Sequence, residues 1–335
     1  MKSKPTLKDV AKLAGVSQMA VSAVLNDTQS TVRVSEGTRK RILEAVDELQ
    51  YNPDVFARSL RLQRANIVGF YNGHGYIDIA DPFAPGMLMG IQSAIVSHGS
   101  SLLLYNGLHQ QDENVVRTKL LSSKADGVLI WPAPGDAALL LSLGQTDKPF
   151  VQLAEAYPGV PNVVTDDYNA ARGLAEHLAE RGHRHVLYRR GALPLTSEEA
   201  RYRAFRDVFL ERGVKMTVTR PAGYENLTDD EKRLIRGYSE SGGITAVACW
   251  HDASAVQVAQ FLAFSEIRMP QDIALTGFDG FSWREFRENA PLTTVSVDWV
   301  KLAAVAANLL IRRINGEEIP ETTVLPGELR IGGTS

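Results

Sequence analysis

The first fifty residues contain three blocks in which apolar side chains recur at helical spacing. Thr6, with Asp9 three residues later, suits the N-cap of a first helix. Gly15 then supplies a turn, Ser17 suits the cap of a second helix, and a third helix is expected over 38–50. The apolar faces are Leu7, Val10, Ala11 and Ala14; Ala20, Val21, Val24 and Leu25; and Ile42, Leu43, Val46 and Leu49. Two short helices joined by a glycine turn predict a helix-turn-helix, with an ordinary helical hairpin as the alternative.

After residue 50 the pattern becomes shorter and more polar. Pro53 suits the first turn of a further helix of about two turns, and a polar run from Arg61 to Asn66 follows it. A helix of that length is unstable alone in water. We therefore expect this segment to fold against an external partner.

From Asn66 onward, short apolar runs alternate with amphipathic helical patterns. Strands are expected at 67–70, 102–105, 127–130, 150–153, 163–165, 186–188, 246–249, 273–276, 293–297 and 322–325. Helices are expected at 87–98, 115–122, 170–181, 200–212, 253–264 and 299–314. This alternation predicts parallel sheets with helices on both faces, and its two successive runs predict two similar half-domains. Because ligands bind beyond the carboxyl ends of such strands, we expect a ligand site in the cleft between the halves.

Charge is distributed unevenly along the chain. Residues 1–64 contain eleven lysines and arginines against seven acidic residues, a balance of +4. The remaining residues contain 25 basic and 32 acidic residues, a balance of −7, so the overall charge of −3 hides the contrast. A basic head on an acidic body predicts that only the head meets nucleic-acid phosphates.

Other features narrow the class of protein. With 335 residues and 44% apolar content, the chain can bury more than one large core. The single Cys249 cannot form an intrachain disulfide, which fits a reducing cytoplasm, and its apolar surroundings favour a role as core filler. No apolar segment resembles a signal peptide or a membrane span. Phosphate-loop, dinucleotide-binding, nucleophile-elbow and zinc-ligand motifs are lacking, so we expect no enzyme activity, no cofactor and no metal site.

Three segments carry a specific resemblance to a known family. The run Thr6 to Asn26, the entry Tyr51-Asn52-Pro53, and Ala57-Arg58-Ser59-Leu60 resemble the lactose repressor and galactose repressor family, and the likeness covers essentially the whole chain. In that family the short helix is a hinge that enters the minor groove, where the leucine matching Leu60 wedges between base pairs. An apolar wedge of this kind can unstack a base step and bend the duplex.

The resemblance also implies the architecture. An all-α helix-turn-helix head precedes an α/β body of two doubly wound parallel-sheet half-domains, of the periplasmic-binding-protein type, with a ligand cleft between them. We expect the head at 1–50, the hinge helix and linker at 51–65, and the effector-binding and dimerisation domain at 66–335. Because the chain crosses back between the halves, the first half is expected to comprise about 66–165 and 293–321. The second half is expected to comprise about 166–292 and 322–332.

The expected DNA contacts come from the head and the hinge. Gln18 and Met19 begin the second helix, whose N-terminal residues face base edges in the major groove. Gln18 can bind adenine with two hydrogen bonds, and Met19 or Ala23 can touch a thymine methyl group. The full expected set is Thr6, Leu7, Ser17, Gln18, Met19, Ser22, Ala23, Asn26, Tyr51, Pro53, Ala57, Arg58 and Leu60. Relatives commonly have an arginine at Ala23 and an asparagine at Asp54, so we expect a different operator sequence.

Aromatic and acidic residues near strand ends are the first ligand candidates. Phe83, in a segment where relatives often carry Asn-Pro-Phe, can stack on a sugar or base face, and loop packing is its alternative. Trp131 ends a strand and offers a second stacking surface. Asp166 matches the acid after the last strand of the first half, and its alternative is a cap of the following helix.

Three further candidates follow from the second run of strands and helices. Arg201 matches the effector-binding arginine of the family and can hold two ligand oxygens, with a surface ion pair as the alternative. Asp279, in Thr-Gly-Phe-Asp, matches a family acid at a strand end. His251-Asp252 stands where many relatives carry Asn-Asp, and Ala154-Glu155 stands where they carry Asp-Arg. His251 is a weaker candidate, because polar strand ends are common on surfaces.

These observations predict a ligand-regulated transcriptional regulator that binds double-stranded operator DNA as a homodimer. The family resemblance favours a repressor released by a small-molecule effector, with a sugar as the expected effector. A corepressor-dependent repressor that responds to a purine or another small metabolite is the alternative. A sugar-binding transport protein is a further alternative, but it would have no use for residues 1–60 and would need a signal peptide.

Overall fold

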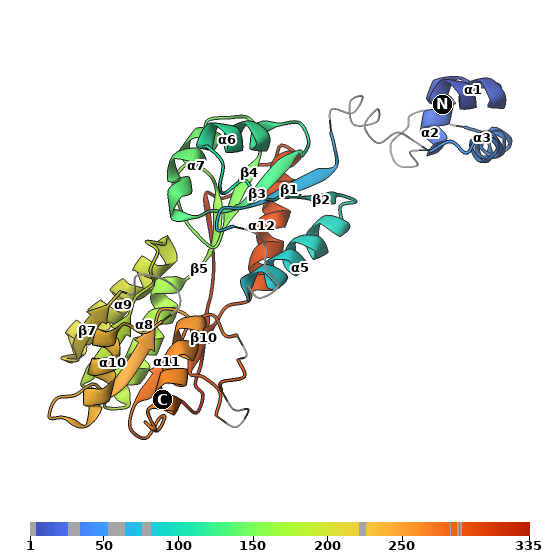
Figure 1. The fold of residues 1–335 in the computed structure, drawn as a ribbon. Helices are drawn as coiled ribbons and strands as arrows, with labels where there is room; N and C mark the ends of the chain where they lie inside the picture. The colour runs from blue at the N-terminus through green and yellow to red at the C-terminus, as the bar shows by residue number, and fades with distance from the viewer. Residues whose placement is uncertain are drawn as a thin grey trace. The chain divides into compact units, whose positions relative to one another are not determined.

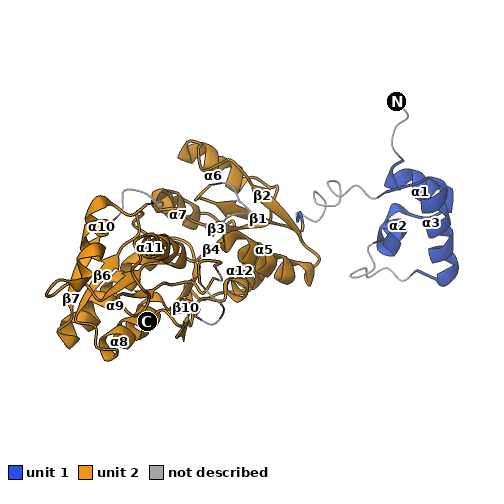
Figure 2. Ribbon diagram, turned by 60° about the horizontal axis from the view of Figure 1, so that its bottom comes forward, with its two compact units in different colours: residues 1–65 blue, residues 66–335 orange. Residues whose placement is uncertain are grey.

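The computed structural model describes residues 5–25, 34–52, 64–75, 82–220, 226–281, 283–286, 288 and 290–335. The chain divides into two compact units, residues 1–65 and residues 66–335 (Figures 1 and 2). The division falls between Ala65 and Asn66, where the polar run meets the first strand. Each unit has its own hydrophobic core.

The first unit is a small helical module. It contains α1 (Leu7–Ala14), α2 (Gln18–Leu25) and α3 (Glu36–Glu48). Thr6 caps α1 in a capping box with Asp9, and Gly15 ends the helix at a φ of 65°, which only glycine adopts at little cost. Val10, Val21 and Ile42, one from each helix, form the core. The helix-turn-helix predicted from the sequence is therefore present.

The second unit begins with a six-stranded sheet in which all strand pairs are parallel. Its strands, in the spatial order β11-β5-β4-β3-β1-β2, are β1 (Ile67–Asn72), β2 (Ser101–Tyr105), β3 (Gly127–Trp131), β4 (Phe150–Leu153), β5 (Asn162–Thr165) and β11 (Thr322–Leu325). Two helices, α5 (Phe83–Val96) and α12 (Trp299–Ile314), cover one face, and α6 (Glu113–Leu121) and α7 (Ala137–Gly144) cover the other. We call this layered unit the first half.

A second, four-stranded parallel sheet forms the second half. Its strands, in the order β7-β6-β8-β9, are β6 (His185–Arg189), β7 (Lys215–Thr219), β8 (Ala246–Cys249) and β9 (Ala274–Thr276). One face packs on α8 (Asp167–Glu180) and α9 (Thr196–Arg212), and the other on α10 (Asp229–Arg236) and α11 (Asp252–Phe264). A short antiparallel pair, β10 (Thr294–Ser296) and β12 (Glu328–Arg330), lies beside it.

The chain passes between the halves at different points from those expected. β11 pairs with β5, so residues 322–325 belong to the first half rather than the second. Residues 294–296 belong to the second half, since β10 pairs with β12 and Ser296 bridges to Asp279 beyond β9. Strand pairing decides both assignments, and sequence order carries no information about it.

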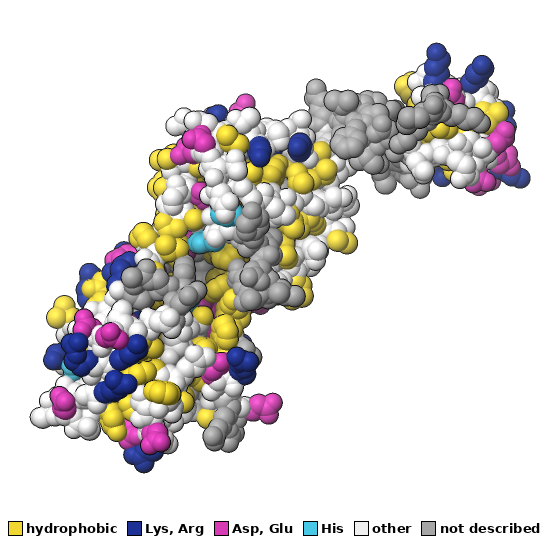
Figure 3. Space-filling model, viewed as in Figure 1, with side chains coloured by type: hydrophobic (Ala, Val, Ile, Leu, Met, Phe, Trp, Pro, Cys, Tyr) yellow, Lys and Arg dark blue, Asp and Glu magenta, His cyan; other side chains and the backbone are white. Residues whose placement is uncertain are grey.

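Helices α5 and α12 come from distant parts of the sequence and pack closely in the first half. Gly90 allows this approach, because a Cβ atom there would overlap the backbone carbonyl oxygen of Val300. On the outer surface, α5 exposes Met89 and Val96, and Leu104 is exposed on the edge strand β2. Over the second half, basic and acidic side chains are interspersed in the view of Figure 3.

Candidate functional site

The N-terminal turn of α2 is exposed on the surface of the head. Ser17 Oγ accepts the backbone N–H of Ala20 at 3.2 Å and so begins the helix. Gln18 and Met19 then project outward, with Met19 69% exposed. The structure thus presents both proposed base-reading side chains to solvent.

The other expected DNA contacts divide into two groups. Thr6 caps α1, Leu7 packs against the core, Ser22 and Ala23 are half-buried on α2, and Tyr51 is buried in the core of the module. Tyr51 therefore stabilises the module, whatever else it contacts. Asn26, Pro53, Ala57, Arg58 and Leu60 lie outside the described residues.

A cavity of about 560 Å³ lies between the two halves at the carboxyl ends of their strands. Five of the six predicted ligand residues line it: Phe83, Trp131, Arg201, His251 and Asp279. This is the position that the parallel-sheet topology predicts. A volume of this size accommodates a small metabolite such as a mono- or disaccharide or a purine.

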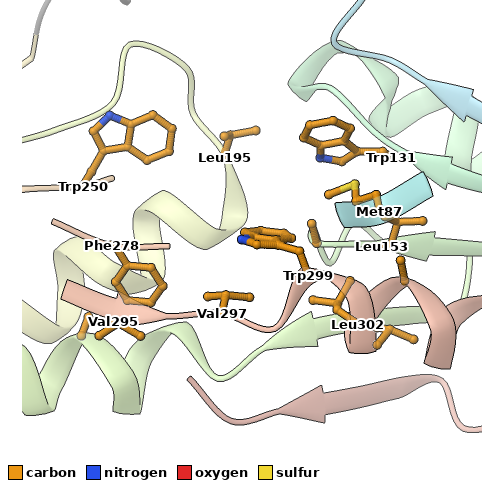
Figure 4. Packing of buried hydrophobic residues seen from close by; sticks show 14 of the residues in the cluster. Met87, Trp131, Leu153, Leu195, Trp250, Phe278, Val295, Val297, Trp299 and Leu302 are labelled. Carbon is orange, nitrogen blue, oxygen red and sulfur yellow. The ribbon is translucent and has the colours of Figure 1, made fainter. Parts of the chain in front are cut away.

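Aromatic rings from both halves form the walls. Figure 4 shows Trp131, at the end of β3, and Trp250, after β8, on opposite sides, with Trp299 between them at the start of α12. The Phe83 ring centroid lies 5.0 Å from those of Trp299 and Phe281, in edge-to-face contacts. Phe83 thus has the packing role that was its alternative, and it also lines the cavity. The Trp299 indole N–H has no hydrogen-bond partner among the described residues.

Arg201 is the cation of the cavity, and it is buried and already paired. Its Nε donates to Asp167 Oδ1 at 2.7 Å, and its Nη1 donates to the Trp250 carbonyl oxygen at 2.9 Å and lies 3.5 Å from Asp279 Oδ1. The guanidinium carbon stands 3.7 Å from the centroid of the Phe278 ring. Asp167, Asp279 and an aromatic face therefore already contact the Arg201 guanidinium, and its surface-pair alternative does not apply.

The acids around Arg201 have altered proton affinities. Burial raises the pKa of Asp167 to about 6, although Arg201 acts to lower it. Burial also raises the pKa of Asp279 well above its ordinary value, against the opposing effect of Arg201. The backbone of Asp279 has a φ of 115°, which is rare for a residue with a side chain and is typical of functional sites.

Asp166, the sixth predicted residue, does not line the cavity. Its side chain caps α8, accepting the backbone N–H of Asn169 at 3.2 Å and the side-chain amide of Asn169 at 2.8 Å. The capping role was its alternative. The acid that reaches the cavity is its neighbour Asp167, the first residue of α8, which pairs with Arg201.

Glu155 was not expected as a site residue, yet it joins the two halves. It follows β4 in the first half, and its carboxylate accepts four hydrogen bonds from the start of α9 in the second half. The donors are the backbone N–H and the hydroxyl of Thr196, at 2.7 and 2.5 Å, and the backbone N–H and the hydroxyl of Ser197, at 3.2 and 2.6 Å. Its place after a buried strand was a signal of the same kind as that used for Asp166.

Two histidines also line the cavity, one from each half. His251 caps α11, and its ring stacks on Trp250 at a centroid distance of 3.9 Å. His74, after β1, was not expected, and its ring lies 4.8 Å from that of Trp131. Burial lowers the pKa of His251 to about 3 and that of His74 to about 4, so both rings are neutral at ordinary pH.

The described residues contain neither a cluster of metal-ligand type nor a helix of membrane-spanning type. No group of three or more histidine, cysteine, aspartate or glutamate side chains there could hold a metal ion. No helix within those same residues is long and apolar enough to cross a bilayer. Cys249 is buried in the core of the second half, as its apolar surroundings indicated.

Comparison with known proteins agrees with this architecture. Residues 6–54 match the family of bacterial regulatory proteins of the LacI type, and residues 175–335 match the periplasmic binding protein-like domain. The chain is 30% identical to the ribose operon repressor of Escherichia coli K12 over 330 residues, which cover 92% of this chain and 93% of the repressor. It is 29% identical to the transcriptional regulator GalR of the same strain over 324 residues, covering 95% and 92%.

The fold has a close counterpart among solved structures. A Lac repressor dimer bound to operator and the anti-inducer ONPF superposes with a TM-score of 0.80, at 22% identity and 99% coverage of both chains. The helical head and the α/β body therefore share the fold of that protein. The chain belongs to the LacI family of bacterial regulatory proteins, as a ligand-regulated DNA-binding repressor.

Proposed function

We propose that this repressor binds its operator as a homodimer and releases it when an uncharged sugar occupies the cavity between the halves. The carrying observation is the composition of that cavity, which has aromatic rings on both walls and a buried cation already paired with Asp167 and in contact with Asp279. Aromatic faces pack against the C–H faces of sugar rings, and polar groups beside them bind hydroxyls. The cavity offers no unpaired cation among the described residues to attract a phosphate or carboxylate.

The head supports the DNA part of the proposal. Gln18 and Met19 are exposed at the start of a capped helix, and the segment that contains them is basic. We infer that base readout comes from α2 and that phosphate contacts supply a salt-dependent share of the affinity. A chain that begins at Asn66 should not bind operator DNA.

The surface of the first half supports self-association. Met89 and Val96 are exposed on α5, and the neighbouring β2 is an edge strand of the sheet that the described residues form. A second copy that covers this surface would bury both features. A Val96→Asp variant should then be monomeric in light scattering, while its circular dichroism spectrum stays that of the parent; a variant that remains dimeric would contradict this interface.

The experiment that tests the ligand proposal is a thermal-shift screen, followed by DNA binding. The panel contains ribose, galactose, cellobiose, their phosphate esters and hypoxanthine. A ligand at a hundred times its dissociation constant adds about 2.7 kcal/mol of stability. We expect a neutral sugar to stabilise the chain and to weaken operator binding in fluorescence anisotropy. Stabilisation by hypoxanthine with tighter operator binding would instead support the corepressor alternative.

A further inference from the structure

The chain enters the first half at the end of the sheet opposite the cavity, where several backbone contacts hold it. Asn66 directly precedes β1, Ser101 begins β2 and Asp126 directly precedes β3, and these three strands are neighbours in the sheet (Figure 1). The Asn66 carbonyl oxygen accepts the Ser101 N–H at 2.9 Å, and the Ile67 carbonyl oxygen accepts the Asp126 N–H at 2.8 Å. Both bonds extend the parallel ladders by one residue and fix the start of β1.

The Asp126 side chain adds a contact that the sheet itself does not require. Its Oδ2 accepts the backbone N–H of Asn66 at 2.7 Å, a distance typical of a hydrogen bond to a charged acceptor. Asn66 has a φ of 54°, in the left-handed region that asparagine adopts more readily than most residues with a side chain. The carboxylate therefore holds the peptide group at which the chain turns into the sheet. The boundary between the two compact units falls at this same peptide group, between Ala65 and Asn66.

Asp126 is itself held in place by its surroundings. The preceding residue, Ala125, is buried in the first half. Lys148 Nζ donates to the Ser122 carbonyl oxygen at 2.6 Å, which ties the loop 122–126 to the segment before β4. The Lys148 ammonium group is also attracted electrostatically to the Asp126 carboxylate. A carboxylate on a braced loop can impose a fixed direction on the backbone that it binds.

We propose that Asp126 is a positioning residue for operator binding, which sets the direction in which the linker leaves each body of the homodimer. A dimer contacts two half-sites at once. Its gain over a single half-site depends on the effective concentration at which the second head meets its own half-site. Fixed linker exits raise that concentration, because the heads then sample fewer orientations. This inference rests on the homodimer of the proposed function and adds the residue that aligns its two heads.

Variants with matched chemistry test the contact. Asp126→Ala removes the acceptor, whereas Asp126→Asn keeps an oxygen at the same reach and is the rescue variant. Asp126→Glu keeps the charge but carries it one methylene further from the backbone, and it provides a second test on a side chain that remains polar. The control is Asp112→Ala, which removes a carboxylate that accepts the Asn114 N–H at 2.9 Å in the connection from β2 to α6. Melting curves of the full chain establish that each variant is folded.

The assay is fluorescence anisotropy on the full chain with two DNA duplexes. One contains two inverted half-sites, selected with the parent from random sequence, and the other has one of those half-sites scrambled. We expect Asp126→Ala and Asp126→Glu to lower the preference for the full site by about tenfold, while affinity for the single half-site changes by less than about twofold. Asp126→Asn should recover most of the preference, and Asp112→Ala should retain all of it. A purely structural role of Asp126 would lower the melting temperature and leave the preference unchanged.

Two results would overturn the inference while the homodimer stands. The first is that folded Asp126→Ala and Asp126→Glu keep the parent's preference for the full site. The second is an equal loss of preference in Asp112→Ala, because removal of any capping carboxylate in this half would then have the same effect. A parent that binds the full site no more tightly than the single half-site, and is monomeric in light scattering, would instead show that the proposed homodimer is wrong, and the role of Asp126 would fail with it.

Discussion

Hydrogen exchange at the start of α9 reports on the contact that Glu155 makes between the two halves. Thr196 and Ser197 are the first residues of α9, and N–H groups at that position have no carbonyl partner within the helix. Both N–H groups donate instead to the Glu155 carboxylate of the other half, at 2.7 and 3.2 Å. Their protection from solvent exchange therefore depends on a residue in the first half.

The expected magnitude follows from these contacts. Hydrogen bonds to a charged acceptor contribute about 1.5–3 kcal/mol each, and the carboxylate also meets the positive end of the helix dipole. When the cost of burying the carboxylate is subtracted, the net stabilisation from the contact is about 3 kcal/mol. A free energy of that size corresponds to about two orders of magnitude in the protection of these N–H groups from exchange. Glu155→Ala should remove this protection. Hydrogen exchange at single-residue resolution measures it directly.

The control is the Glu199 N–H group, which donates to the Leu195 carbonyl oxygen within the same segment at 3.1 Å. Its protection should change little in Glu155→Ala, because α9 itself remains folded. If Thr196 and Ser197 exchange at equal rates in the parent and the variant, the contact does not hold the halves together in solution. Loss of protection at Glu199 as well would indicate unfolding of α9 and would contradict the assignment to an interdomain contact.

Three further predictions concern other parts of the molecule. Burial lowers the pKa of His251 to about 3, so at pH 5 its imidazole is protonated in the unfolded chain but not in the folded one, and the parent loses stability as the pH falls through about 6.5. Between pH 7 and pH 5, the free energy of unfolding of His251→Asn, measured by urea denaturation, should therefore rise by about 2 kcal/mol relative to that of the parent. If the difference between variant and parent does not change with pH, His251 is not a buried neutral histidine. Gln18→Ala should relax base preference at one operator position by about 1–3 kcal/mol in competition anisotropy, whereas uniform weakening on all sequences would make Gln18 a phosphate contact. Thr334 is fully buried, and its hydroxyl accepts from the Thr293 N–H at 2.9 Å and donates to the Leu275 carbonyl oxygen at 2.7 Å. Thr334→Val removes both hydrogen bonds and should lower the free energy of unfolding by about 1–3 kcal/mol, whereas Thr334→Ser, which keeps the hydroxyl, should lower it less.

Much of the fold was readable from apolar periodicity. The helix at Trp299–Ile314 and the strands at Phe150–Leu153 and Ala246–Cys249 have the expected limits, because each is a predominantly buried apolar run. The strand at Lys215–Thr219 was missed, since it forms a sheet edge with mixed exposure. The helix at Asp229–Arg236 was missed because most of its residues are charged.

The cavity was predictable at the level of strand ends and less so at the level of individual side chains. Trp131 ends a strand and was identified on that ground, and Asp279 was identified because it matches a family acid at a strand end. Asp166 and Asp167 are adjacent acids, and only the direction in which the chain enters α8 decides which one reaches Arg201. His74 follows its strand through a turn, and nothing in its sequence neighbours signals that its ring reaches Trp131.

The interleaving of the two halves has a consequence for biosynthesis. β11 occupies the edge of the first sheet beside β5, and α12 covers the same face as α5, although both elements lie in the last forty residues of the chain. A nascent chain that has not yet been extended to Leu325 lacks this edge strand. The apolar side chains of α5 and of the sheet remain without their cover until α12 leaves the ribosome. The first half therefore cannot complete its fold until α12 and β11 have been synthesised, and its apolar surface is open to association with other chains during that interval.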